Sequence, residues 1–315
     1  MEVVRINLET NINSIPEGLV VALGYFDGIH NAHMDLINRV IKIGKDEDLK
    51  TGIVTFHPHP SFVLNKDDIT NFLTPLEIKL ELIEEIDIDY VFIIEFDLET
   101  AKIKHKEFVE KFFVPLNIKH VVAGFDNRYG HMGEGSINTL ESDSNYTIQV
   151  IVINERTYNG KKIGSSYIRE LLKQGKVNII KDILGRFYSI DGFVTHGRGR
   201  GKSIGVPTAN LALKYPYSVP KKGVYVVRVF HDDNIYYGIC NIGNNPTFNY
   251  NKNKTIEINI LNFDKDIYGD YLKIEFIDRI RSELKFNTIE ELVLQIDKDK
   301  KYANNTIDNI HFTNI

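Results

Sequence analysis

The sequence predicts two domains, an α/β domain followed by an all-β domain that ends in a helix. Residues 20–153 alternate short β-branched runs with helical patterns, which is typical of βαβ units around a parallel sheet. After residue 185 the pattern changes to closely spaced strands separated by Gly, Asn, Asp and Pro turns, which indicates an antiparallel β domain. A chain of 315 residues is long enough for each domain to bury its own core.

Local sequence marks the elements of the α/β domain. The predicted strands are residues 20–23, 52–56, 90–96, 120–125 and 147–153. Thr74 is a candidate N-cap, Pro75 suits the first helical position, and Glu77 completes a capping box. Because Leu80 and Ile83 then fall on one face, we expect a helix that begins after Thr74.

The all-β domain has its own strand and helix signals. The expected strands are residues 224–230, 235–242, 256–261 and 272–277. A capping box at residues 288–291 precedes apolar side chains at positions 289, 292, 293 and 296, which predicts a packed C-terminal helix. Between the domains, residues 167–173 indicate a helix that ends at Gly175. We place the boundary near residue 183, with domains at residues 1–182 and 183–315.

The composition is that of a globular protein without a membrane span, since 43% of the residues are hydrophobic and no long uncharged apolar run is present. The N-terminus carries Glu2 and Arg5 and lacks an apolar signal core, so no export is expected. A single cysteine, Cys240, excludes an internal disulfide and fits a reducing compartment, which favours a cytoplasmic protein. The net charge of −5 argues against nucleic acid as a partner. The oligomeric state is left open.

Residues 196–210 are the most informative stretch, because they join a glycine-rich basic loop to a hydroxyl and an amide. Glycines let backbone N–H groups approach phosphate oxygens, and cationic side chains offset the phosphate charge. Thr208 and Asn210 are suited to hold a hydrated Mg²⁺ beside such a phosphate. The stretch matches neither a Walker A loop nor a dinucleotide fingerprint, so the residues alone predict a phosphate or nucleotide site.

Two motifs resemble known families. Residues 205–210, Gly-Val-Pro-Thr-Ala-Asn, resemble the signature of riboflavin kinases, and the similarity extends through residues 222–225, 241–248 and 255–258. Residues 24–33, Gly-Tyr-Phe-Asp-Gly-Ile-His-Asn-Ala-His, resemble the signature of FMN adenylyltransferases. Together they resemble the bacterial bifunctional riboflavin kinase and FAD synthetase family over nearly the whole chain. The resemblance implies a Rossmann-like nucleotidyltransferase domain, then an antiparallel β-barrel kinase domain that ends in a helix.

For the C-terminal domain, the resemblance implies phosphorylation of riboflavin to FMN by ATP and Mg²⁺. It assigns Thr208 as a Mg²⁺ and phosphate ligand, Asn210 as its neighbour, and Glu257 as the base that accepts the ribityl 5′-hydroxyl proton. From the residues alone, Glu257 alternates with isoleucines on a strand, and a solvated glutamate is the simpler interpretation. Arg281 and Phe286 are flavin-side candidates, because flat apolar or guanidinium groups suit the isoalloxazine ring. The expected nucleotide flap contains Gly197, Gly199, Arg200, Gly201, Lys202 and Gly205.

For the N-terminal domain, the resemblance implies adenylylation of FMN to FAD by ATP and Mg²⁺, with the FMN phosphate as nucleophile and pyrophosphate as leaving group. His30 and His33 fall at the start of an expected helix, where anions bind, and the resemblance implies that they and Arg169 contact the ATP phosphates. The other nucleotide-binding candidates are Gly24, Phe26, Asp27, Gly28, Ser165 and Ser166. The flavin-binding candidates are His57, Pro58, Asp126, Asn127 and Arg128, which follow predicted strands.

Other functions remain open for the N-terminal domain. Ala32 replaces a glycine of the family pattern His-x-Gly-His, and residues 164–167, Gly-Ser-Ser-Tyr, replace Ser-Ser-Thr-x. These departures leave a second hypothesis, a riboflavin kinase whose N-terminal domain is a regulatory nucleotide- or flavin-binding module. A flavin-responsive RNA-binding regulator is opposed by the acidic balance. Histidines 30, 33, 57 and 59 also suggest a zinc cluster, although no cysteine or carboxylate pattern completes one.

Overall fold

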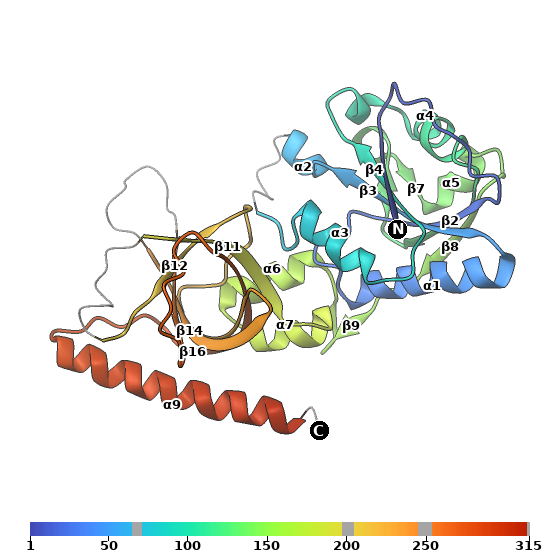
Figure 1. Cartoon of the computed structure of the whole chain (residues 1–315). Coiled ribbons are helices and arrows are strands. Elements are labelled where there is room, and N and C mark those ends of the chain that lie inside the picture. Colours follow the sequence, from blue (N-terminus) through green and yellow to red (C-terminus); the bar gives the residue numbers. More distant parts are fainter. Residues whose placement is uncertain (65–70, 197–204, 245–253, 314–315) are drawn as a thin grey trace. The chain divides into compact units, whose positions relative to one another are not determined.

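The computed structural model describes residues 1–64, 71–196, 205–244 and 254–313 (Figure 1). The chain divides into two compact units, Met1–Ser165 and Ser166–Ile315. The first unit contains a parallel sheet covered by helices, and the second contains a closed barrel with helices around it. This is the predicted fold class, which the structure confirms.

A six-stranded parallel sheet organises the first unit. Its order is β1-β4-β3-β2-β5-β8, and every neighbouring pair is parallel. The strands are β1 (Glu2–Ile6), β2 (Leu19–Leu23), β3 (Lys50–His57), β4 (Tyr90–Glu95), β5 (Ile118–Gly124) and β8 (Gln149–Ile153). The ribbons β6 (Arg128–Tyr129) with β7 (Gly135–Ser136), and β9 (Thr157–Tyr158) with β10 (Lys161–Lys162), lie outside it. The strand order reverses between β2 and β5, and open α/β sheets bind ligands at such a switch point.

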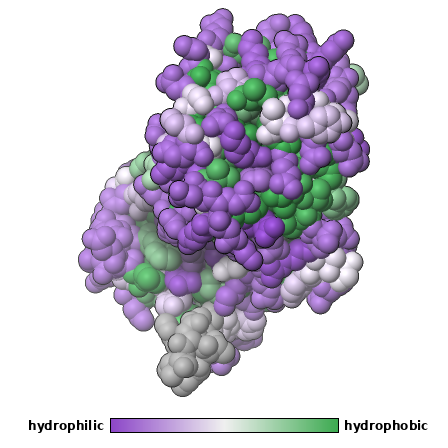
Figure 2. All heavy atoms as spheres, turned by 90° about the vertical axis from the view of Figure 1, so that its right-hand side faces the viewer, coloured by the Kyte–Doolittle hydropathy of each residue, from purple (hydrophilic) through white to green (hydrophobic). Residues whose placement is uncertain are grey.

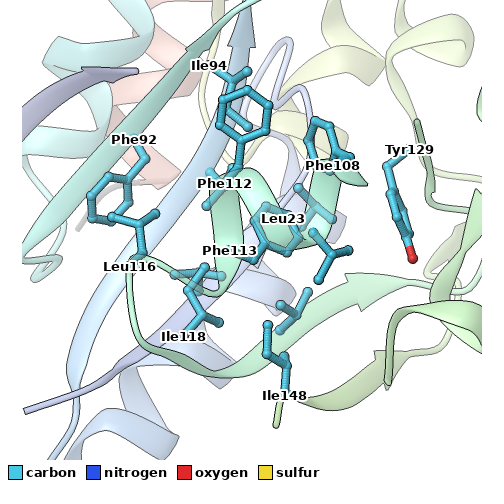
Figure 3. Close-up of a cluster of buried hydrophobic side chains, with 14 of the residues drawn as sticks. Leu23, Phe92, Ile94, Phe108, Phe112, Phe113, Leu116, Ile118, Tyr129 and Ile148 are labelled. Carbon is cyan, nitrogen blue, oxygen red and sulfur yellow. The ribbon is translucent and has the colours of Figure 1, made fainter. Parts of the chain in front are cut away.

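Helices cover both faces of this sheet. They are α1 (Asn31–Glu47), α2 (Pro60–Val63), α3 (Leu76–Glu84), α4 (His105–Phe108) and α5 (Ile137–Asp143), with the short turns η1 (Thr100–Lys102), η2 (Val109–Phe113) and η3 (His131–Gly133). All five residues of β2 are buried, because its alternate side chains face two separate cores. Val20 and Ala22 pack with α1 and α3, whereas Leu23 packs with Phe108 and Phe112 on the other face (Figure 3).

The start of α3 differs from the prediction. The helix begins at Leu76 with Pro75 as its N-cap, and no side chain caps it, so the predicted Thr74 cap is wrong. The Thr74 N–H instead donates to the Asp27 carboxylate at 2.9 Å. That long-range bond holds residue 74 against the turn after β2, outside the helix.

The second unit is built around a closed barrel of antiparallel strands in the order β11-β12-β15-β14-β13-β16. The strands are β11 (Tyr188–Thr195), β12 (Ala209–Leu213), β13 (Gly223–His231), β14 (Asn234–Asn244), β15 (Lys254–Ile260) and β16 (Tyr271–Arg281). The helices α6 (Ser165–Gln174) and α7 (Val177–Leu184) precede the barrel, and α9 (Ile289–Thr313) follows it. Gly175 ends α6 with a left-handed φ of 81°, as the sequence predicts.

The helix α9 packs on the barrel. Its Ala303 and Ile307 share a buried cluster with strand residues that include Val226 and Ile239. The Glu291 N–H donates to the Thr288 hydroxyl at 3.2 Å, which confirms the predicted N-terminal signal. The middle of α9 therefore lies beside the barrel wall.

Some boundaries and strands were not evident from sequence. The strand predicted from residue 147 begins at Gln149, and β1, β11 and β12 were not among the expected strands. Only Ile6 of β1 is fully buried, and the apolar alternation of Val4 and Ile6 around Arg5 is too short to stand out in the sequence. The domain boundary near residue 183 stays a prediction, because compactness groups α6 and α7 with the barrel.

Hydrophilic side chains cover most of the face in Figure 2, and hydrophobic residues gather there in smaller patches. Within the described residues, no helix combines the length and the apolar character needed to cross a membrane.

Candidate active sites

The turn between β2 and α1 carries the first candidate site. Phe26, Gly28 and Ile29 have left-handed backbone conformations, with φ of 57°, 95° and 39°. Such conformations cost of the order of 1–3 kcal/mol for bulky residues and persist only where the surroundings hold them. A Cβ on Gly24 would lie 3.2 Å from the Phe26 ring, so the turn also needs a small residue at its start. The turn delivers His30 to the N-cap position of α1.

His30 and His33 form a stacked pair at this helix N-terminus. Their ring centroids lie 3.6 Å apart with an interplanar angle of 16°. The His33 N–H donates to His30 Nδ1 at 3.3 Å, so a neutral His30 carries its proton on Nε2. The Phe26 ring packs on His33 with 5.0 Å between centroids. The helix N-terminus and the imidazole N–H groups together favour an anion such as a phosphate.

Asp27 braces the turn from inside the protein. It is 2% exposed, and its carboxylate accepts the Leu73 N–H at 3.0 Å and the Thr74 N–H at 2.9 Å. Its carbonyl accepts the Ser165 hydroxyl at 2.7 Å. Both polar ends of Asp27 therefore hold the turn, and so does Ser165, another predicted nucleotide-binding residue.

The predicted flavin-binding residues lie at the carboxyl ends of β3 and β5, on either side of β2. His57 ends β3 and is followed by a cis peptide bond to Pro58. Asn127 donates from Nδ2 to the Leu23 carbonyl at 3.1 Å, which ties the segment after β5 to the end of β2. Asp126 forms an ion pair with Lys162.

The side chains at the carboxyl ends of β3 and β5 differ in charge. Burial above all, then the charges of Arg5 and Lys79, lowers the pKa of His57, so its ring is neutral at pH 7. Arg128 is the first residue of β6 and pairs with Ser136 on β7. The edge thus combines a neutral imidazole with exposed charged side chains beyond β5.

The zinc hypothesis lacks a ligand cluster in the described part of the chain. No group of three or more His, Cys, Asp or Glu side chains is placed there to hold a metal ion. His30 is stacked on His33, and the Nδ1 atom of His59 accepts the Ser61 N–H at 3.0 Å. The two histidine pairs are therefore engaged in separate local contacts.

The departures from the family pattern fit the backbone. Ala32 lies in α1, and its φ is not among the left-handed values, so the position does not require glycine. A Cβ on Gly164 would meet no atom within 4 Å, and its φ is also ordinary. A serine or an alanine would therefore fit at residue 164 as well as the glycine does.

Two pockets open on the barrel, and Thr208 lines both. The first pocket is bounded by Val194, Ala209 and a segment at residues 263–268. The second is bounded by Glu257 on β15, Arg281 on β16 and apolar residues of α9. A group bound at Thr208 would therefore be reachable from both pockets.

Strand pairing brings the predicted kinase residues together. Asn210 on β12 is the register partner of Glu257 on β15, which in turn pairs with Asn241 on β14. Residues opposite each other in an antiparallel sheet share a face, so these three side chains lie on one face near Thr208. Asn259 donates from Nδ2 to the Pro207 carbonyl at 2.7 Å and holds the approach to Thr208.

The predicted alternation along β15 is confirmed. Ile256, Ile258 and Ile260 are 2%, 0% and 7% exposed, and they form the buried face of the strand. Glu257 lies on the other face, in the lining of the second pocket.

Arg281 is fixed by the C-terminal helix. It donates to the Asp299 carboxylate from Nε at 3.0 Å and from Nη2 at 2.7 Å, a bidentate pair. Asp299 is 2% exposed and also accepts the Gln295 side-chain amide at 2.9 Å. The guanidinium carbon lies 6.0 Å from the Phe286 ring centroid, and both side chains line the second pocket.

Part of the predicted nucleotide flap lies outside the described residues. These positions are Gly197, Gly199, Arg200, Gly201 and Lys202. Gly205, at the end of the flap, has a left-handed φ of 75°, which favours glycine there.

Comparison with known proteins matches each half of the chain to a family. Residues 12–167 match the family described as FAD synthetase, and residues 184–307 match the family described as riboflavin kinase. A protein of Bacillus subtilis (strain 168), named bifunctional riboflavin kinase/FMN adenylyltransferase, is 42% identical over 90% of this chain and 91% of its own length. A protein of the same name from Listeria monocytogenes is 37% identical over 90% of each chain.

The chain belongs to the bifunctional riboflavin kinase/FMN adenylyltransferase family. The two matched regions support both activities of the family over a kinase with a silent N-terminal domain. A crystal structure titled macrolide-efflux protein from Streptococcus pneumoniae has the same fold, with a TM-score of 0.89 and 30% identity over 97% of this chain and 99% of that one. The efflux named in that title has no counterpart in the sites described above.

Two further residues of the adenylyltransferase motif are on α6. Ser166 and Arg169 both fall in this helix and belong to the barrel unit by compactness. Their contact with ATP stays a prediction.

Two buried residues with positional roles were missed by the sequence analysis. Lys79 follows Leu76 by three residues and precedes Ile83 by four, so the three share one helical face. A charged residue on the face that packs on the core could have been recognised from the sequence. Asp299 follows Ile296 by three residues, again on the apolar face of its helix. Buried charges at core positions are rarely unpaired, and both residues have partners.

Proposed function

We propose how the two units of this bifunctional enzyme divide its chemistry. The enzyme phosphorylates riboflavin to FMN and adenylylates FMN to FAD, with ATP as co-substrate of both steps. The barrel carries out the first reaction and the parallel-sheet unit the second. The observation that carries the kinase assignment is that Thr208 lines both pockets. A residue that contacts the phosphate while the phosphate passes from donor to acceptor must be reachable from both.

In the kinase site, ATP occupies the first barrel pocket and riboflavin the second. Glu257 accepts the proton of the ribityl 5′-hydroxyl as that oxygen attacks the γ-phosphorus of ATP, and ADP leaves. Arg281 and Phe286 face the flavin ring. The side-chain oxygens of Thr208 and Asn210 fit Mg²⁺, which prefers such hard ligands. When bound there, the ion would neutralise phosphate charge.

In the adenylyltransferase site, the FMN phosphate attacks the α-phosphorus of ATP and pyrophosphate leaves. His30 and His33 stabilise the charge that develops on the phosphates, from the N-terminus of α1. The edge at the carboxyl ends of β3 and β5 binds FMN. Small molecules are the partners that these sites require. We place the enzyme in the cytoplasm, where ATP is supplied.

The test is to incubate the purified chain with ATP and Mg²⁺, with riboflavin in one tube and FMN in a second, and to separate the flavins by chromatography. We expect FAD in both tubes, and no turnover in a third that contains EDTA. FMN without FAD in the first tube would show a kinase alone. No new flavin in either tube would overturn both assignments.

A further inference from the structure

Lys79 is a buried cation that contacts the adenylyltransferase motif. Its side chain is 2% exposed, although lysines are seldom buried without a specific partner. Nζ donates to the Tyr25 carbonyl at 2.6 Å and lies 3.5 Å from the Thr55 hydroxyl. The ammonium also lies 4.2 Å from the centroid of the Tyr25 ring. A helix residue thus reaches the turn that leads into His30.

The Tyr25 carbonyl is the point where the turn leaves the sheet. The Thr55 hydroxyl donates to the same carbonyl at 3.0 Å, so this oxygen accepts from two donors. The next residue, Phe26, has a left-handed φ of 57° and packs on His33. A displacement of the carbonyl would therefore pass directly to Phe26 and to the histidine that it supports.

The start of α3 holds the same turn at a second point. The Asp27 carboxylate accepts the N–H groups of residues 73 and 74, immediately before the helix. Lys79, on α3, donates to the turn, and Asp27, in the turn, accepts from the residues immediately before α3. The two contacts together connect the turn to α3. Two such contacts define an orientation, whereas one would leave the turn able to rotate.

We propose that Lys79 is a positioning residue for adenylyl transfer, whose ammonium holds the Tyr25 carbonyl and thereby orients His30 and His33. The inference rests on the adenylyltransferase activity of the first unit. It gives Lys79 no contact with ATP or FMN.

The surroundings of the ammonium indicate when it carries charge. Burial lowers the pKa of Lys79 from its ordinary value of 10.5 to about 8, and the Asp27 carboxylate opposes that shift. The other titratable groups nearby are the neutral His57 on β3 and His59, whose ring lies 4.0 Å from that of Tyr25. Below pH 8 the ammonium is charged, and above it the contact with the carbonyl weakens.

The buried charge does not serve the stability of the fold at neutral pH. Because the folded pKa of Lys79 lies below the unfolded value, the unfolded state binds more protons between about pH 8 and 10.5. The contribution of Lys79 to stability therefore rises with pH across this window and is least favourable below it. Replacement by an apolar side chain of similar length is expected to leave the melting temperature unchanged or higher at pH 7.

The experiment compares Lys79→Met with wild type and with Lys45→Met, which removes a lysine that is 70% exposed. In the full-length enzyme, we expect Lys79→Met to lower kcat for FAD formation from FMN between about tenfold and a hundredfold, as a small misplacement of reacting groups does. FMN formation from riboflavin stays at the wild-type rate, which provides an internal control, and the melting temperature is unchanged or higher. Lys45→Met changes none of these quantities.

Two readouts distinguish positioning from a structural role. In wild type, kcat for FAD formation should fall as pH rises through about 8, and this limb should be absent in Lys79→Met. The imidazole ¹⁵N spectrum should show the Nε2–H tautomer of His30 in wild type and its loss in the variant. A wild-type kcat in Lys79→Met, a lost activity with a lowered melting temperature, or an unchanged tautomer would each overturn the proposal. If the wild-type enzyme forms no FAD, the proposed adenylyltransferase activity is wrong. The His30 tautomer then still tests whether Lys79 orients His30.

Discussion

Asp27, Lys79 and Asp299 are each 2% exposed, and each meets groups from a distant segment. Charged side chains are buried to this extent only where protein donors or acceptors replace water. Asp27 lies in the turn after β2 and Lys79 donates to that turn, whereas Asp299 accepts from Arg281 in the lining of the second pocket. Single buried charges therefore hold residues of both proposed sites.

The Arg281–Asp299 pair gives a residue-scale prediction. Asp299→Asn removes the charge that holds the guanidinium, so Arg281 loses its fixed position in the second pocket. We expect the KM for riboflavin to rise about tenfold, because charge-assisted bidentate pairs are strong and specific in geometry. Steady-state kinetics of FMN formation measure this change.

A matched control exists on the same strand. Asp278 on β16 accepts the Tyr302 hydroxyl at 2.7 Å in an exposed position, so Asp278→Asn should leave the KM for riboflavin unchanged. FAD formation from FMN should be unaffected in both variants. If Asp299→Asn retained the wild-type KM, Arg281 would have no part in binding the flavin.

At the scale of elements, close strand contact limits what the barrel tolerates. Gly192 on β11 pairs with β12 on one side and with β16 on the other. A Cβ at this position would lie 2.1 Å from the Ala212 carbonyl oxygen, a distance that forces the backbone to shift. The closure of the barrel therefore depends on a glycine that no turn signal explains.

Gly192→Ala should destabilise the barrel by at least about 1–3 kcal/mol, the usual cost of overpacking in a well-packed region. Chemical denaturation, followed by the loss of riboflavin kinase activity, measures the effect. Gly164→Ala is the control, because its Cβ meets open space and its stability should match wild type. Equal stability of the two variants would contradict the close approach of β11 and β12.

Local signals predicted elements well where the local contacts prevailed. The Thr288 cap at the start of α9 formed because its partner, Glu291, is three residues away. The predicted capping box at Thr74 did not form: α3 begins after Pro75, and Asp27, 47 residues away, accepts the Thr74 N–H that Glu77 was expected to accept. Edge strand β1 escaped prediction since its apolar alternation is limited to Val4 and Ile6.

At the scale of the whole molecule, the residues proposed for the two activities form separate sets. The pocket that contains Glu257 is lined by residues of the barrel unit, and the histidine pair lies in the parallel-sheet unit. Each reaction should therefore be removable without loss of the other.

Glu257→Ala and Thr208→Ala should abolish FMN formation from riboflavin and leave FAD formation from supplied FMN. Arg169→Ala should do the reverse, because it removes a predicted contact to the ATP phosphates. Both reactions are measured by chromatography of the flavins in parallel tubes. Loss of both activities in all three variants would contradict separate sites.

The sequence by itself determined the two fold classes, the order of most elements and the motifs at both sites, because periodicity, caps and signatures are properties of neighbouring residues. Only the tertiary structure decided how those motifs are held. Lys79 reaches Tyr25 across 54 residues, and Arg281 reaches Asp299 across 18. Thr208 lies between two pockets because β12 pairs with β15. Such contacts depend on packing between distant segments, which no local pattern specifies.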